Sequence, residues 1–119
     1  MFGTMGDDIE KIITNTLRPL LPLECQRLGV PSSFVQGIYS IFPKPFEYSS
    51  FCEPIEQGGK INAVRIRIDT TIRSKSQALR DFWHEMYHAK EYFEGRETHS
   101  EAKATLYSWR RYLEKLLHL

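Results

Sequence analysis

The segment 82–89 constrains the fold of this chain more than any other, because two of its residues can act together only on a helix. It reads Phe-Trp-His-Glu-Met-Tyr-His-Ala, so His84 and His88 are four positions apart with Glu85 between them in sequence. On a helix, side chains four positions apart lie on one face, one turn from each other. The segment is therefore predicted to be helical, and the rest of the chain must supply what packs around it.

The limits of this helix can be predicted from its flanking residues. Ser74-x-x-Gln77 is a capping-box pattern at the start, and Gly95 is a natural stop. His84 and His88 are predicted to lie roughly opposite an apolar stripe, on a face open to a cleft. That stripe is formed by Leu79, Phe82, Met86, Ala89 and Phe93.

Three strand candidates precede the helix. Residues 34–42 are rich in β-branched and aromatic residues, and residues 46–52 form a weaker candidate that Pro54 is expected to end. Gly58-Gly59 predicts a tight turn. Residues 61–72 alternate between apolar and polar, which is typical of an antiparallel sheet with one face in water. The inward set is Val64, Ile66, Ile68 and Ile72, and the outward set is Arg65, Arg67, Asp69 and Arg73.

Helices are predicted at both ends of the chain. Asp7 or Asp8 can cap a scaffold helix whose apolar positions are Ile9, Ile12, Ile13 and Leu17. Pro19 and Pro22 bend or interrupt it, and a short helical piece over residues 23–28 ends at Gly29. A C-terminal helix begins near Thr98, with its core side predicted at Leu106, Trp109 or Arg110, Leu113 and Leu117. The expected fold class is α+β: a scaffold helix, a sheet of about three strands, the His-containing helix and a C-terminal glutamate helix.

The bulk composition predicts one soluble domain over residues 1–119. The formal charge of +1 comes from 16 basic and 15 acidic residues without a long block of one sign, so no nucleic-acid partner is expected. No apolar run is long enough for a membrane span and no signal peptide is recognisable, which favours a cytoplasmic protein. Cys25 and Cys52 are expected to be free buried thiols rather than a disulfide. The oligomeric state stays open, with a dimer among the alternatives.

The pattern H-E-x-x-H on a helix indicates chemistry as well as structure. Two neutral imidazoles can bind Zn²⁺, and catalytic zinc has three protein ligands and a water. The third ligand must lie downstream, where the candidates are Glu91, Glu94, Glu97, His99 and Glu101. A straight helix carries Glu91 and Glu94 past the metal, whereas an antiparallel neighbouring helix can turn Glu101 back toward it. We therefore favour Glu101 and keep His99 as an alternative.

Glu101 also has a competing structural role. Thr98-x-x-Glu101 is itself a capping-box pattern, which would use the carboxylate for the backbone. A cap at Ser100 would leave Glu101 free. Small Ala104, nearly one turn on, favours close approach of the two helices.

The combination of His84-Glu85-x-x-His88 with Glu101 in a following helix, on so short a chain, resembles the minigluzincins. These are minimal soluble archaeal-type peptidases of the gluzincin clan. The resemblance covers the order helix, small sheet, His-containing helix and glutamate helix, and it depends on four specific residues. It implies a zinc-dependent endopeptidase, and also latency, in which a terminal segment blocks the cleft. The C-terminal residues 112–119, which include His118, are one candidate for that segment, and a frayed helix end is the alternative.

The expected mechanism assigns one role to each residue. Zn²⁺ on His84, His88 and Glu101 lowers the pKa of its bound water and polarises the scissile carbonyl. Glu85 acts as general base and then acid, and a peptide or protein substrate lies extended along a sheet edge. Tyr87, Tyr107, Tyr112, His99 and His118 are the available oxyanion donors, with none singled out. The alternative function is a catalytically silent zinc-binding or protein-interaction module with the same fold.

Overall fold

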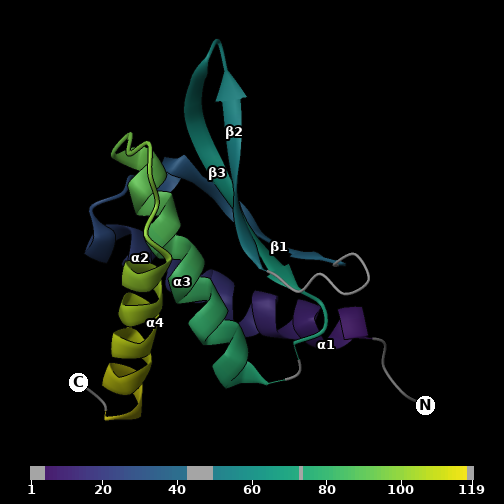
Figure 1. Cartoon of the computed structure of the whole chain (residues 1–119). Coiled ribbons are helices and arrows are strands. Elements are labelled where there is room, and N and C mark those ends of the chain that lie inside the picture. The colour runs from purple at the N-terminus through teal and green to yellow at the C-terminus, as the bar shows by residue number, and fades with distance from the viewer. Residues whose placement is uncertain (1–4, 43–49, 73, 118–119) are drawn as a thin grey trace.

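A three-stranded sheet and the helices packed against it make up the α+β fold of this chain (Figure 1). The computed structural model describes residues 5–42, 50–72 and 74–117, with side chains described from Asp8 onward. The helices are α1 (Met5–Ile12), α2 (Leu21–Leu28), α3 (Lys75–Phe93) and α4 (Glu101–Leu116), and the strands are β1 (Val35–Ile41), β2 (Phe51–Gln57) and β3 (Lys60–Asp69). None of the helices in these ranges combines the length and the apolar composition that crossing a bilayer requires.

The N-terminal helical segment is formed as predicted, except at its start. Helix α1 begins at Met5, so Asp7 and Asp8 lie inside the helix and the predicted cap at either of them is wrong. Helix α1 continues through a π turn at Ile13–Leu17 and a 3-10 turn at Arg18–Leu20 into α2. The two prolines stand in the first turns of the 3-10 helix and of α2, where a missing N–H is tolerated, so they change the helix geometry without ending the segment. Gly29 closes α2 with φ of 73°, as predicted for a left-handed C-terminal residue.

The sheet has the order β1-β3-β2 and is mixed, not antiparallel as predicted. Strands β2 and β3 form an antiparallel hairpin, and Gly58 and Gly59 make its predicted turn with φ of 60° and 78°. Strand β1 pairs with the other edge of β3 in parallel. Alternation along β3 reports only which face is buried, so it could not reveal the direction of a neighbouring strand.

Two strand boundaries differ from the prediction. Strand β2 runs through Pro54, which pairs with Val64, because β2 is an edge strand where a residue without an N–H is tolerated. Residues 46–49 of the predicted strand lie outside the described residues. Strand β3 ends at Asp69, which is fully buried instead of pointing into water. Its carboxylate accepts hydrogen bonds from the backbone N–H and the hydroxyl of Thr71, a local turn that competes with the strand.

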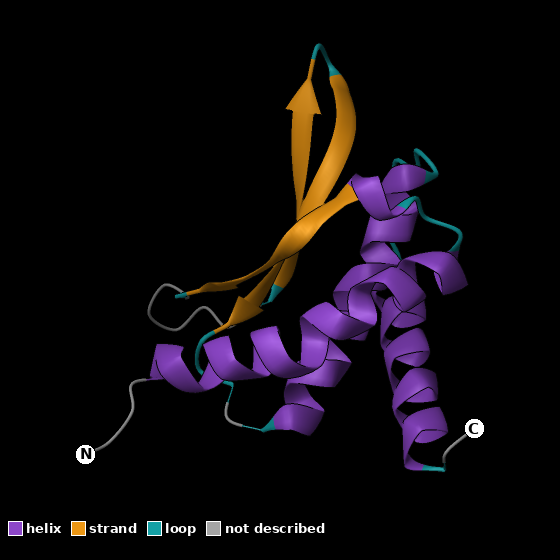
Figure 2. Cartoon of the chain, turned by 180° about the vertical axis from the view of Figure 1, so that it is seen from behind, coloured by secondary structure: helices purple, strands orange, loops and turns teal. Residues whose placement is uncertain are grey.

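The core lies between one face of the sheet and helices α1 and α3 (Figure 2). Ser74 caps α3 by accepting a hydrogen bond from the backbone N–H of Gln77, and Gly95 follows the helix end with φ of 72°. Phe93, at the last position of α3, is partly exposed although it was predicted to be in the stripe. Cys25 and Cys52 are buried free thiols, as expected. The fully buried residues of the core include Ile9, Ile13, Leu17, Ile38, Val64, Ile66, Ile68, Phe82 and Met86.

Helix α4 packs beside α3, but it does so with a different face from the predicted one (Figure 1). It buries Ala104 and Ser108, and Tyr107 and Arg111 hydrogen-bond to Glu24 of α2. Small residues at the contact allow the two helices to approach closely. The large apolar residues of α4 lie on its other face and are exposed to solvent. The exposed positions are Leu106, Trp109, Arg110, Leu113 and Leu117.

Candidate metal centre

Helix α3 holds His84 and His88 one turn apart, with their ring centroids 5.0 Å from each other. The helix is fixed by its cap and by the burial of its apolar stripe on the sheet. The His84 side chain is 21% exposed, whereas that of His88 is only 6% exposed. His88 is therefore less open than predicted, and one cause is the ring of His99, which stacks on it with centroids 5.5 Å apart.

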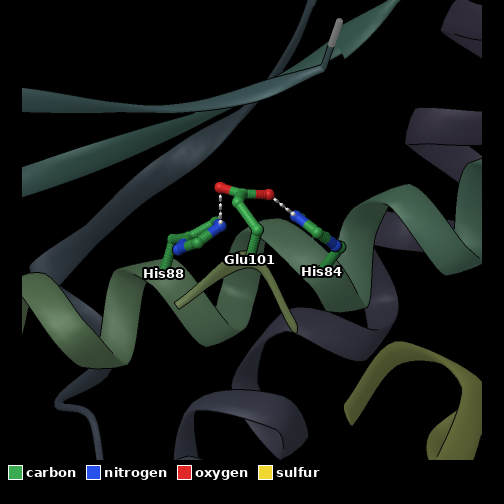
Figure 3. A group of neighbouring side chains, drawn as sticks. All are labelled: His84, His88 and Glu101. Atoms are coloured by element: carbon green, nitrogen blue, oxygen red, sulfur yellow. Dashed lines mark hydrogen bonds and ion pairs between the residues drawn. The ribbon is translucent and has the colours of Figure 1, made fainter. Parts of the chain in front are cut away.

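The carboxylate of Glu101 lies between the two imidazoles (Figure 3). Oε2 of Glu101 is 2.8 Å from Nε2 of His84, and Oε1 is 2.8 Å from Nε2 of His88. The cap of α4 is Ser100, whose hydroxyl accepts a hydrogen bond from the backbone N–H of Lys103 at 3.1 Å. The competing cap at Thr98 is thus not formed, and Glu101 is free for the histidines. The structure brings together the three residues that the sequence analysis selected as metal ligands.

The contacts of Glu101 with the two histidines determine the direction in which its pKa shifts. The Glu101 side chain is 77% exposed, so it is only partly desolvated. This partial desolvation raises the pKa of Glu101, but the hydrogen bond with His84 and the charges of both histidines outweigh it and lower that pKa overall. The contact of His88 Nε2 with Glu101 is short but lacks hydrogen-bond geometry, so this buried nitrogen has no hydrogen-bond partner among the described residues. A buried ring nitrogen facing a carboxylate oxygen requires a proton or a cation between them.

Glu91 fixes the orientation of the His88 ring. Nδ1 of His88 lies 2.7 Å from one carboxylate oxygen of Glu91, and the backbone N–H of Ser100 donates to the other at 2.9 Å. Glu91 is 1% exposed, and a buried carboxylate is an acceptor that assigns the proton of His88 to Nδ1. When the ring is neutral, the lone pair of Nε2 then points toward Glu101, which is the arrangement of a metal-ligating histidine.

Among the described residues, the other ligand candidates predicted from the sequence do not lie close enough to His84 to share a metal ion with it. Glu94 pairs with Arg96 at the end of α3, and Glu97 is exposed in the loop. His99 stacks on His88, and its Nδ1 is 3.9 Å from Glu91. His88, Glu91 and His99 form a second close group, but its carboxylate already accepts two hydrogen bonds in the interior.

Glu85 is buried beside the three candidate ligands and faces the same cleft. Burial, followed by the charges of Glu101 and Asp81, raises the pKa of Glu85 to about 9, while a hydrogen bond from the backbone of Cys52 opposes the increase. The carboxyl therefore keeps its proton at neutral pH unless a positive charge lies nearby.

Two cavities adjoin each other at the candidate metal centre. The larger has a volume of about 440 Å³ and extends from His84 along α3 and α4, and the smaller, of about 160 Å³, lies beside His88 and His99. Phe51, Glu85 and Glu101 line both. Because Phe51 begins the edge strand β2, the cleft opens next to an edge of the sheet.

Several residues of the site were not predicted from the sequence. Glu91 was predicted only as a candidate ligand, and Asp81 and Arg80 of the cleft wall were not predicted at all. Helical spacing could have found them, since residues three and four positions from the histidines lie on the same face. Of the oxyanion candidates, Tyr107 donates to Glu24 and His99 lines the smaller cavity. His118 lies outside the described residues.

Comparison of this chain with protein-family models, with curated proteins and with solved structures finds no match. Three features define the chemistry of the candidate metal centre: the convergent nitrogens of His84 and His88, the bridging carboxylate of Glu101, and the buried Glu85 in the cleft.

Proposed function

We propose that this protein is a zinc-dependent endopeptidase of the gluzincin type, with His84, His88 and Glu101 as metal ligands. The observation that carries the proposal is that the Nε2 atoms of two histidines of α3 each lie 2.8 Å from one carboxylate, which α4 supplies. Two imidazoles and one carboxylate form a ligand set typical of hydrolytic zinc sites. The buried Nε2 of His88, which lacks a hydrogen-bond partner among the described residues, fits a cation as its partner.

Bound Zn²⁺ would supply Lewis acidity, which activates water for attack and polarises the scissile carbonyl. Glu85 would accept the proton of the attacking water and pass it to the leaving amine. A cation held by the three ligands favours the ionised form of Glu85, so the carboxyl whose pKa is raised in the metal-free site becomes a competent base. Glu91 would keep His88 in the tautomer that leaves Nε2 available.

A peptide substrate is expected to bind in an extended conformation along β2. Strand β2 is an edge of the sheet, and its first residue, Phe51, lines the cleft. An extended chain can add to such an edge through main-chain hydrogen bonds, which would place a peptide bond near Glu85.

Metal analysis combined with a proteolysis assay tests this function. We expect the purified wild-type protein to bind one equivalent of zinc and to cleave a fluorescently quenched casein. Glu85→Gln should retain zinc but lose activity by roughly 10²- to 10⁴-fold, because the proton acceptor is gone. Glu101→Ala should lose zinc, whereas Glu97→Ala, which changes an exposed acid of the loop before α4, should not.

The outcomes separate the proposal from its alternatives. Full zinc occupancy in Glu101→Ala would refute the third ligand, and equal proteolysis by wild type and Glu85→Gln would refute the general base. Zinc binding without any hydrolysis by the wild type would favour a silent zinc-binding module. Latency is a further part of the proposal: if a terminal segment blocks the cleft, a variant that ends at residue 111 should cleave casein faster than the full chain.

A further inference from the structure

Arg80 lies in the wall of the larger cavity, one helical turn before His84. Residues four positions apart share a helix face, so Arg80 and His84 project from α3 toward the same cleft. The lining of this cavity also includes Glu85 and Glu101. A group bound by Arg80 would therefore lie beside the candidate metal centre.

Two aromatic rings lie beside the Arg80 guanidinium. Its central carbon lies 4.6 Å from the ring centroid of Trp109 and 5.6 Å from that of Tyr112. The hydroxyl of Ser108 donates to the backbone carbonyl of Arg80 at 2.6 Å, which ties this turn of α3 to α4. Cation–π contacts of this kind restrain the guanidinium without using its N–H donors.

Most of the Arg80 donors are unused. The guanidinium has five N–H donors, and the hydrogen bond that it makes within the described residues runs from Nη2 to the side-chain oxygen of Gln77 at 3.3 Å. Within the described residues, the buried Nε of Arg80 has no hydrogen-bond partner, and no carboxylate lies within ion-pair distance of the guanidinium. A buried donor without an acceptor is costly, which favours a ligand that supplies one.

The carboxylates of the cleft are occupied by other groups. Asp81 accepts hydrogen bonds from Ser50 and from Gln77, both at 2.7 Å. Glu101 contacts the two histidines, and Glu85 accepts a hydrogen bond from the backbone of Cys52. The positive charge of Arg80 is therefore not neutralised by an ion pair with any of these acids.

We propose that Arg80 binds a carboxylate of the substrate and makes this protein prefer peptides that present such a group in the cleft. A carboxylate matches the planar N–H edge of arginine through paired hydrogen bonds. The group can be an Asp or Glu side chain or the C-terminal carboxylate of a peptide. The inference rests on the proposed function for the identity of the ligand as a peptide, but it concerns binding and not hydrolysis.

Peptide binding to the Glu85→Gln variant, in which substrate is not consumed, tests the inference directly. The probes are acetylated and amidated alanine hexapeptides with Glu or Gln at each internal position in turn, together with an acetylated alanine hexapeptide whose C-terminus is free or amidated. Binding is followed by calorimetry and by the Arg Nε–H signals in ¹⁵N NMR spectra. We expect a carboxylate-containing peptide to bind roughly tenfold or more tightly than its neutral counterpart and to shift the Arg80 signal. The pair that shows this preference identifies the source of the carboxylate.

Variants at Arg80 complete the experiment. Arg80→Met keeps the aliphatic packing against Trp109 and should remove the preference for the charged peptide, and Arg80→Lys should restore only part of it. Arg110→Met removes an exposed arginine of α4 and should leave the preference unchanged. Equal discrimination by the Arg80 variants and their parent, or an Arg80 signal that responds equally to charged and neutral peptides, would overturn the inference. Carboxylate binding without hydrolysis by the wild type would instead count against the proposed function alone.

Discussion

Glu91 connects the two helices that carry the candidate ligands. One of its oxygens accepts a hydrogen bond from His88 of α3, and the other accepts one from the backbone of Ser100, immediately before Glu101. A single buried carboxylate thus sets both the His88 tautomer and the start of α4. Outer residues of this kind commonly determine metal affinity as strongly as they determine local structure.

Glu91→Gln is expected to weaken zinc binding by roughly 10- to 100-fold, because the amide holds the His88 ring less firmly than a carboxylate does. The measurement is a competition titration against a zinc-selective dye. Glu94→Gln is the matched control, since Glu94 is exposed and pairs with Arg96. Equal zinc affinity of the Glu91→Gln and Glu94→Gln variants would contradict the orienting role.

At the scale of the elements, the position of α4 depends on its N-terminus and on two residues near its middle. At the N-terminus, Ser100 caps the helix and so places Glu101 in its first turn. Farther along, α4 is anchored to the buried Glu24 of α2 by two hydrogen bonds. The hydroxyl of Tyr107 donates to Oε2 of Glu24 at 2.8 Å, and Nε of Arg111 donates to Oε1 at 2.7 Å. These contacts hold the helix whose first residue must reach the histidines of α3.

Ser100→Ala should lower the free energy of unfolding by about 1 kcal/mol, because the backbone N–H of Lys103 loses its acceptor. Thr98→Ala should change it much less, since the cap at Thr98 is not formed. Urea unfolding of the two metal-free variants measures the difference. A larger loss in Thr98→Ala than in Ser100→Ala would show that the capping box at Thr98 is the true start of the helix.

Tyr107→Phe should lower stability at neutral pH by roughly 1 to 3 kcal/mol, because buried Glu24 loses a donor. Burial, the charge of Glu24 and this hydrogen bond raise the pKa of Tyr107. The folded state then holds the phenolic proton more tightly than the unfolded chain, whose tyrosines ionise near pH 10. The contribution of Tyr107 to the free energy of unfolding is therefore fully present below about pH 10 and is lost as the pH rises further.

The measurement for Tyr107 is urea unfolding at a series of alkaline pH values. Wild type should lose free energy of unfolding above about pH 10 more steeply than Tyr107→Phe does. Tyr39→Phe, a change at a more exposed tyrosine, should keep the wild-type slope. Parallel curves for wild type and Tyr107→Phe would disprove the coupling.

At the scale of the whole molecule, α3 belongs to the core and to the candidate metal centre at once. Phe82 and Met86 are fully buried against the sheet, while His84 and Glu85 between them face the cleft. Glu101 comes from the neighbouring helix, so a cation at the site would link α3 to α4. If the proposed function is correct, metal binding must therefore stabilise the entire fold.

Zinc at 100 times its dissociation constant should increase the free energy of unfolding by about 2.7 kcal/mol, because the unfolded chain lacks the assembled ligands. Thermal unfolding with zinc and with a chelator measures this as an upward shift of the Tm. His84→Ala should abolish most of the shift, whereas the Arg110→Met variant should keep it. An identical shift in His84→Ala would place the zinc elsewhere.

Features encoded within a few residues could be predicted from the sequence. The cap at Ser74, the turn at Gly58-Gly59 and the end of α3 near Gly95 all depend on local hydrogen bonds or on positive φ, and the structure has each of them. The choice of Glu101 also followed from local reasoning, since a short loop makes α3 and α4 neighbours. Whether these residues bind zinc stays a prediction.

The tertiary structure alone decided how distant segments meet. Alternation along β3 could not show that β1 runs parallel to it, because the pattern reports burial and not strand direction. The apolar stripe of α4 suggested the wrong buried face, since the helix instead packs through Ala104 and Ser108 and satisfies Glu24. The segment 82–89 thus determined a helix with two histidines on one face. Packing between helices decided that a carboxylate joins the histidines and that Arg80 lies in the same cleft, because such contacts depend on how buried surfaces fit together.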